Sequence, residues 1–283
     1  MEDPRFLLAR VLGFATSCEG IDAVVQTGSR ARGQRVDALS DLDIELIGPG
    51  APLLAGRDEW LADIAPTLVS IHLDNEDDED GPGWPTCLVV FADGRKADFT
   101  LAGPERLAAM KEHGLDELYG RGYVVHLDNT GITADLSPSD PTPPEREAPD
   151  AEGFEVNQRE FWFETTQVPV YAKRGDLWPA TSRLAETREL LLTMLEWYAG
   201  TRSGEPVDTW HNGHHMAEWL GPDHSRIPAT FARYDADDII RALRATADLY
   251  ADIAARTGKT LSLPVLDLHD RVLAHVDAVY RED

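Results

Sequence analysis

The segment VVQTGSR at residues 24–30, followed by DLDIEL at residues 41–46, decides how the first half of this chain folds. The first segment predicts a short buried strand that ends in a Gly-Ser turn. The second predicts a strand over residues 42–47, which stops at a Gly-Pro-Gly sequence. Because alternate residues of a strand share a face, Asp41 and Asp43 should project from the same side of a sheet.

The residue types in these segments indicate a metal-dependent phosphate site. Gly28 lets the backbone approach a phosphate closely, and Ser29 adds a backbone N–H and a hydroxyl. Two carboxylates as close as Asp41 and Asp43 repel each other unless a cation lies between them. Hard oxygen ligands on a rigid strand suit Mg²⁺, which is held partly by the phosphates of a substrate.

A third acid, Asp98, lies in a later predicted strand over residues 96–101. Apolar residues flank it there, and an unpaired charge in such a place is costly. If this strand neighbours residues 42–47, three carboxylates converge beside the Gly-Ser turn. Two metal ions need such an arrangement to activate a hydroxyl and to stabilise a leaving pyrophosphate.

Two further features surround these acids. Arg30, Arg32 and Arg35 lie within six residues of Ser29, although the chain is poor in basic residues. They predict positive charge where a triphosphate binds. Glu45 follows at strand spacing, and we expect it at the edge of the same face or bound to a partner outside the site.

The composition excludes some classes of partner. The chain has 283 residues, with 26 Lys and Arg, 51 Asp and Glu, and a formal net charge of −25. This charge argues against binding to nucleic acid or to an anionic membrane, but leaves cationic small molecules open. Two cysteines, no signal peptide and no long apolar run predict a reduced, cytoplasmic protein.

The patterning predicts two domains, over residues 1–136 and 151–283, joined by a proline-rich linker over residues 137–150. The first mixes strands with helices. Its strand before the Gly-Ser turn covers residues 21–27. Further strands are expected at 68–73 and 87–91, helices at 4–18, 57–65 and 104–112, and an Asp-Gly hairpin turn at residues 93–94. The second is mostly helical, with predicted helices at 183–199 (ended by Gly200), about 210–220, 236–257 and 266–280.

These motifs resemble those of the polymerase-β-like nucleotidyltransferase superfamily, whose signature is Gly-Ser, Asp-x-Asp and a later acid. The chain resembles more closely the streptomycin (aminoglycoside 6-) adenylyltransferase family, over most of its length. In the first domain the resemblance rests on GSR (28–30), DLD (41–43) and FADGRKADFTL (91–101). In the second it rests on EFWF (160–163), YAK (171–173) and MLEWY (194–198). The chain departs from the family at residues 174–179 and at the histidines near 211–215, in the half expected to choose the acceptor.

The resemblance implies an α+β fold, in which a polymerase-β-like nucleotidyltransferase domain with a mixed β-sheet precedes an α-helical C-terminal domain. It also implies Mg²⁺-dependent transfer of AMP from ATP to a hydroxyl, with pyrophosphate leaving. Asp41 and Asp43 would hold the metals. Asp98 would complete the metal site or accept the proton of the acceptor, since both roles need a carboxylate within hydrogen-bond reach.

The resemblance further assigns the two substrates. Gly28, Ser29 and Arg30 would cradle the β- and γ-phosphates, and Lys173 would add a point charge to the triphosphate. Glu160 is the alternative to Asp98 as general base. With Glu164 it flanks the aromatic run over residues 161–163, which is predicted either to bind a cationic acceptor or to pack in the core.

Some alternatives stay open at this stage. His211 and His214 have the spacing of zinc ligands, but a role in helix entry or in a substrate wall is favoured. The favoured function is transfer to an aminoglycoside such as streptomycin, which gives antibiotic resistance. The same chemistry on another small molecule or on a protein side chain is the second hypothesis, and a non-catalytic nucleotide-binding regulator is the third.

Overall fold

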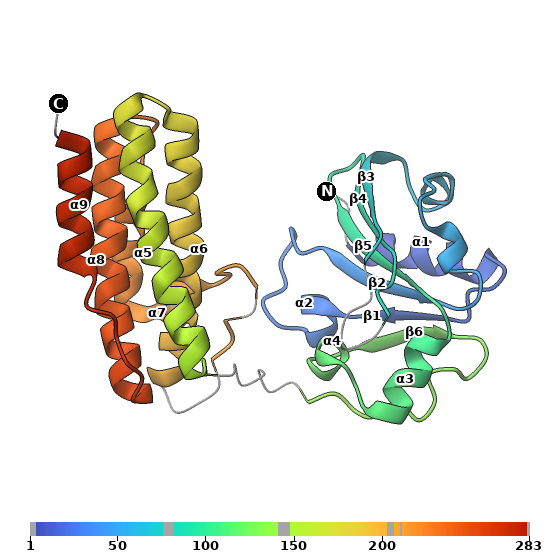
Figure 1. Ribbon diagram of the computed structural model, residues 1–283. Helices are drawn as coiled ribbons and strands as arrows, with labels where there is room; N and C mark the ends of the chain where they lie inside the picture. The colour runs from blue at the N-terminus through green and yellow to red at the C-terminus, as the bar shows by residue number, and fades with distance from the viewer. Residues whose placement is uncertain (1–3, 76–81, 141–147, 203–206, 210, 282–283) are drawn as a thin grey trace. The chain divides into compact units, whose positions relative to one another are not determined.

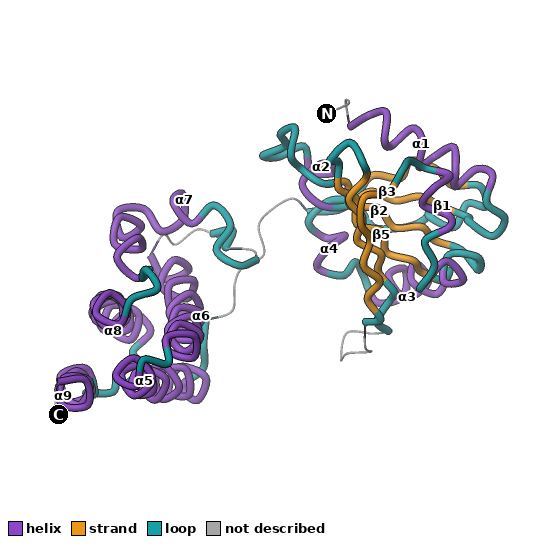
Figure 2. The backbone as a smooth tube through the Cα atoms, turned by 90° about the horizontal axis from the view of Figure 1, so that it is seen from above, coloured by secondary structure: helices purple, strands orange, loops and turns teal. Residues whose placement is uncertain are grey.

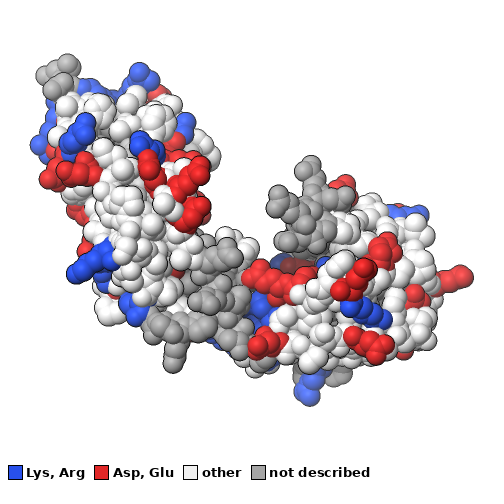
Figure 3. Space-filling model, turned by 60° about the horizontal axis from the view of Figure 1, so that its bottom comes forward, with Lys and Arg blue, Asp and Glu red and all other residues white. Residues whose placement is uncertain are grey.

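The structure is a computed structural model that describes residues 4–75, 82–140, 148–202, 207–209 and 211–281. The chain divides into two compact units, Met1–Thr142 and Pro143–Asp283 (Figure 1). The boundary falls inside the predicted linker. Residues 141–147 of that linker, and residues 76–80 of an acidic run, lie outside the described residues. On the face drawn in Figure 3, acidic side chains lie on both units.

The first unit is built on a six-stranded mixed sheet, in the order β3-β4-β5-β2-β1-β6. The pair β2–β5 is parallel and the other pairs are antiparallel. The elements are α1 (Pro4–Ser17), β1 (Ala23–Gln26), α2 (Gly28–Arg32), β2 (Leu42–Ile47), the 3₁₀ helices η1 (Pro52–Leu54) and η2 (Glu59–Asp63), β3 (Thr67–Leu73), β4 (Thr86–Phe91), β5 (Lys96–Ala102), α3 (Glu105–His113), α4 (Glu117–Gly120) and β6 (Val124–Asp128).

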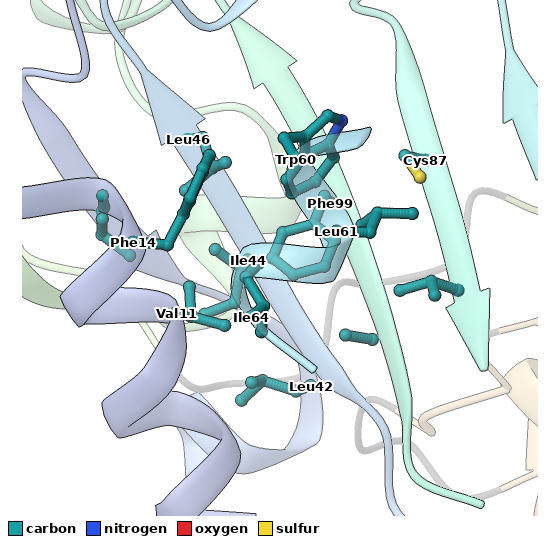
Figure 4. Packing of buried hydrophobic residues seen from close by; sticks show 14 of the residues in the cluster. Val11, Phe14, Leu42, Ile44, Leu46, Trp60, Leu61, Ile64, Cys87 and Phe99 are labelled. Carbon is teal, nitrogen blue, oxygen red and sulfur yellow. The ribbon is translucent and has the colours of Figure 1, made fainter. Parts of the chain in front are cut away.

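The alternation of β2 explains which way its acids point. Leu42, Ile44 and Leu46 are buried in the main core of the unit, where Val11 of α1 and Trp60 of η2 also lie (Figure 4). The intervening residues of β2 therefore project from the other face of the sheet.

That other face is covered by helices at one end of the strands. Ile47 and Ala102, at the ends of β2 and β5, pack in a second cluster with residues of α3 and α4. Asp43 and Asp98 lie near the starts of the same two strands. The fold thus places these acids at the opposite end of the two strands from the second cluster.

Most of the predicted elements of the first unit are confirmed. The Asp-Gly turn joins β4 to β5 as an antiparallel hairpin, and Gly94 has a φ of +86° there. The segment predicted as a helix at 57–65 forms the shorter 3₁₀ helix η2. The strand β6, which pairs with β1, has no counterpart among the predicted strands.

The second unit is helical, as predicted (Figure 2). Its described elements are α5 (Ala151–Arg174), α6 (Leu177–Arg202), α7 (Met216–Leu220), the 3₁₀ helix η3 (Gly221–Thr230), α8 (Ala236–Leu261) and α9 (His269–Arg281). Helix α5 packs against α6, α8 and α9. No described helix is both long and apolar enough to span a membrane.

Helix α5 has no counterpart among the predicted helices, α6 begins at Leu177 rather than at residue 183, and two further predicted helix boundaries are also wrong. Helix α6 continues through Gly200 to Arg202, because one glycine costs a helix only about 1 kcal/mol and packing along α6 outweighs that cost. The helix predicted from about residue 210 begins only at Met216. His211, Asn212 and His215 have positive φ angles, and such angles are incompatible with a right-handed helix.

Candidate active site

The turn between β1 and α2 lies directly against the first carboxylate of β2. Gly28 has a φ of +69°, which favours glycine, and a Cβ built on it would lie 1.9 Å from Oδ2 of Asp43. The backbone N–H of Thr27 donates a hydrogen bond to the carbonyl oxygen of Asp43, at 3.1 Å. Glycine is therefore required at position 28 by both the backbone angle and the contact, and Ser29 follows it in α2.

The three acids singled out from the sequence come together. Because β2 and β5 are parallel, Asp43 lies opposite Asp98 in the sheet, and Asp41 directly precedes β2. One carboxylate oxygen from each of the three lies within 4.8 Å of the others. Among the described residues, this is the only group of three or more acids, histidines or cysteines arranged to hold a metal ion.

The cluster disfavours the charged forms of Asp43 and Asp98. The pKa of Asp43 is raised to about 6, first by burial and then by the charges of Asp41 and Asp98. Burial also raises the pKa of Asp98, while Lys96 opposes this effect. Oδ1 of Asp98 is buried and has no hydrogen-bond partner among the described residues. Each of these features favours a bound cation at this place.

Lys96 is a site residue that is not among those predicted from the sequence. Its ammonium lies 2.9 Å from Oδ2 of Asp41 and 2.9 Å from Oδ2 of Asp98. The sequence did hold a signal for it, because residues two apart on a strand share a face and Lys96 precedes Asp98 by two. Its link to Asp41 depends on the pairing of β2 with β5 and was not visible in the sequence.

Arg30 has a different setting from the predicted one. Its guanidinium donates hydrogen bonds to the carbonyl oxygens of Asp37, Ser40 and Asp41, at 2.6 to 3.1 Å. These bonds connect α2 to the segment that leads into β2, so Arg30 holds Asp41 in place. Arg32 lies near enough to Asp43 to lower its pKa, although burial and the neighbouring acids outweigh this effect.

Glu45 is bound to partners outside the acid cluster. It lies on the same face of β2 as Asp43, but only 1% of its surface is exposed. Arg106 donates to both of its carboxylate oxygens, at 3.0 and 3.2 Å, and the hydroxyl of Tyr119 donates at 2.8 Å. Arg106 also pairs with Asp116 at 2.6 Å. This buried network joins β2 to α3 and α4.

In the second unit, Glu160 lines an acidic pocket of about 930 Å³ between α5 and α6. Both carboxylate oxygens of Glu164 accept hydrogen bonds from Arg183, at 2.9 and 3.0 Å. The charged residues that line the pocket are five glutamates and two arginines: Glu160, Glu164, Glu186, Glu189, Glu196, Arg159 and Arg183.

The aromatic run next to Glu160 divides between the pocket and the core. Phe163 is 62% exposed and lines the pocket. Phe161 stacks on Tyr250 in the core with the ring centroids 3.5 Å apart, and Trp162 is 4% exposed. Of the two alternatives for this run, packing in the core therefore holds for Phe161 and Trp162, since the period of the helix turns both of them inward.

A family model described as streptomycin adenylyltransferase matches residues 1–279. The chain belongs to the streptomycin adenylyltransferase family. Among solved structures, it is similar to an aminoglycoside 6-adenyltransferase from Bacillus subtilis, with 19% sequence identity, a TM-score of 0.48 and coverage of 100% of both chains. No curated protein sequence matches it significantly. The family identifies the protein as an adenylyltransferase enzyme.

Two further predicted site residues of this adenylyltransferase lie in the helical unit. Lys173 is exposed on the last turn of α5. It follows Glu164 by nine residues, so at about 100° per residue the two project from opposite sides of the helix, and Lys173 does not line the acidic pocket. Its role toward a triphosphate stays a prediction. His211 lines the acidic pocket.

Proposed function

We propose that this adenylyltransferase transfers AMP from ATP to a hydroxyl of a streptomycin-like aminoglycoside, in a Mg²⁺-dependent reaction that releases pyrophosphate. The observation that carries the proposal is the convergence of Asp41, Asp43 and Asp98 within 4.8 Å, beside the glycine turn of a chain in this family. The modified antibiotic would no longer act on its target, so the expected physiological outcome is resistance.

The residues present fit a divalent cation. Three carboxylates and the ammonium of Lys96 leave a formal charge of −2 in the cluster, and the buried Oδ1 of Asp98 has no hydrogen-bond partner among the described residues. Oxygen ligands from two paired strands suit Mg²⁺. Asp41, Asp43 and Asp98 would hold the ion, which when bound supplies positive charge to the triphosphate and to the pyrophosphate that leaves.

The turn at Gly28 is the proposed binding place for the outer phosphates. Gly28 lies directly against Asp43, so a phosphate bound to the backbone of this turn would lie beside the acids, and Ser29, the second residue of α2, adds a hydroxyl there. We assign Arg30 a supporting role, since its guanidinium already donates to three backbone carbonyls. It would position Asp41 and the turn toward the nucleotide.

The acidic pocket of the helical unit supports a cationic acceptor. Its five glutamates and two arginines give a formal charge of −3, and Phe163 exposes an aromatic ring beside them. Carboxylates and an aromatic face are the groups that bind ammonium and guanidinium ions. We propose that Glu160 binds the acceptor there. A neutral acceptor would leave this charge uncompensated, which disfavours the alternative of an uncharged small molecule.

The test is an acceptor panel. The full chain is incubated with ATP, Mg²⁺ and, separately, streptomycin, other aminoglycosides or a protein acceptor, and pyrophosphate release is followed together with the mass of each acceptor. We expect streptomycin to gain one adenylyl group, and Asp41→Asn to abolish the reaction without loss of the fold. The proposal would be contradicted if pyrophosphate were released but no aminoglycoside gained an adenylyl group, or if Asp41→Asn kept full activity.

A further inference from the structure

A single ammonium occupies the place between two carboxylates of the acid cluster. Lys96 Nζ lies 2.9 Å from Oδ2 of Asp41 and 2.9 Å from Oδ2 of Asp98, so it bridges two strands with one charge. Without it, carboxylate oxygens within 4.8 Å of each other would lose the ammonium that bridges two of the three acids. Lys96 therefore reduces the electrostatic repulsion between the carboxylates of the cluster.

The ammonium is bound to carboxylates that a metal ion would also use. Oδ1 of Asp98 is buried and has no hydrogen-bond partner among the described residues, whereas Oδ2 is bound to Lys96, so an ion that binds Asp98 lies next to the ammonium. Asp41 likewise presents its Oδ2 to the lysine. An ammonium and a divalent cation on the same two carboxylates repel each other strongly, so both cannot be held there together.

Lys96 is able to leave. Its side chain is 42% exposed, and a lysine carries its charge on a flexible four-carbon stem. Once its ammonium leaves Asp41 and Asp98, Lys96 needs a new anionic partner close to these two acids. The phosphates of a nucleotide bound at the Gly28 turn have that charge and that position, since Gly28 lies directly against Asp43.

We propose that Lys96 is an exchangeable counter-cation, which holds Asp41 and Asp98 together before loading and is displaced by the metal onto the phosphates of the nucleotide. It is thus a positioning residue that makes metal and nucleotide bind cooperatively, because each ligand removes a cost of binding the other. The inference rests on the proposed function for the identity of the nucleotide. The competition between Lys96 and a metal ion does not depend on the proposed function, since it concerns residues of this chain alone.

The first test measures metal binding without nucleotide. Mn²⁺ is titrated into the full chain, and free Mn²⁺ is counted by electron paramagnetic resonance. We expect Lys96→Met to bind Mn²⁺ about tenfold more tightly than the wild type, because two partly exposed ion pairs no longer compete for the ligands. Lys111→Met is the matched control. Lys111 is an exposed lysine of α3, so its variant has the same net charge and should bind Mn²⁺ as the wild type does.

The second test reports the position of the lysine itself. The chain has only four lysines, Lys96, Lys111, Lys173 and Lys259, so acetylation of each is readily followed by mass spectrometry. We expect Mn²⁺ alone to raise the acetylation rate of Lys96. Mn²⁺ with a non-hydrolysable ATP analogue should lower it again. Lys111 and Lys259 serve as internal references, whose rates should not change.

The outcomes separate this inference from the proposed function. Equal Mn²⁺ affinity in the wild type and Lys96→Met, or a labelling rate of Lys96 that Mn²⁺ does not alter, overturns the inference even if AMP transfer to streptomycin is found. The expected Mn²⁺ and labelling results in a protein that modifies no aminoglycoside support the exchange of Lys96 and reject the proposed acceptor.

Discussion

Gly28 gives the sharpest test of the site, because a matched glycine, Gly33, lies at the other end of α2. Gly28 has a φ of +69° and Gly33 a φ of +63°. A Cβ at position 28 would lie 1.9 Å from Oδ2 of Asp43, whereas a Cβ at position 33 would meet nothing within 4 Å. The variants Gly28→Ala and Gly33→Ala therefore share the backbone strain and differ in the contact with Asp43.

The expected size of the effect follows from these geometries. In either variant, an alanine in the left-handed region costs about 1–2 kcal/mol. In Gly28→Ala, the carboxylate of Asp43 must also move by roughly 1 Å, since contacts under 3.0 Å are essentially never seen. A displacement of about 1 Å in a catalytic constellation is enough to lower the rate about 100-fold. We expect Gly28→Ala to lose at least about 100-fold in kcat/KM, and Gly33→Ala to stay close to the wild type.

The assay combines pyrophosphate release under saturating Mg²⁺ and ATP with thermal unfolding of both variants. A similar loss of Tm in the two would show that the shared strain is present. Equal activities would then refute the reasoning, since the contact with Asp43 would have no consequence for the site. Unchanged Mn²⁺ binding by Gly28→Ala would refute it as well, because a displaced Asp43 carboxylate must weaken the metal site.

Three more predictions concern other parts of the molecule. Asp43 has a pKa of about 6 in the folded protein against a usual 3.8, so the folded state binds its proton more tightly than the unfolded state does. The unfolding free energy of the metal-free protein should therefore fall, by up to about 3 kcal/mol, as the pH rises from 4 to 6. Urea unfolding across that range should show the slope in the wild type, and its persistence in Asp43→Asn would contradict the assignment. Glu45→Gln removes the buried charge that faces Arg106, which keeps only its ion pair with Asp116, and should cost about 3–5 kcal/mol in urea unfolding. The exposed Glu112→Gln should cost little, and equal losses in the two variants would reject the network. Glu160→Gln should raise KM for a cationic acceptor and leave KM for ATP unchanged. The control is Glu152→Gln, because Glu152 lies on the same helix but outside the pocket. A change in both KM values of Glu160→Gln would reject an acceptor-binding role.

The local pattern of the first domain carried much information about the fold. The alternation of Leu42, Ile44 and Leu46 predicted both the strand and the face on which its acids lie, because a strand has a period of two. The Gly-Ser turn and the Asp-Gly hairpin were predictable for the same kind of reason, since few residues tolerate a positive φ. In the helical unit the pattern was weaker. The boundaries at Gly200 and Met216 depended on packing and on backbone angles that the sequence did not indicate.

The sequence by itself determined the kind of chemistry: a glycine turn, three carboxylates on or next to strands, and few cations in an acidic chain. Only the tertiary structure decided how the charges are paired. Lys96 meets Asp41 because β5 pairs with β2, and Arg30 turns to backbone carbonyls rather than outward. The physical reason is that a residue type is local, whereas an ion pair depends on which strands neighbour each other, and the partners here are 55 residues apart in the chain.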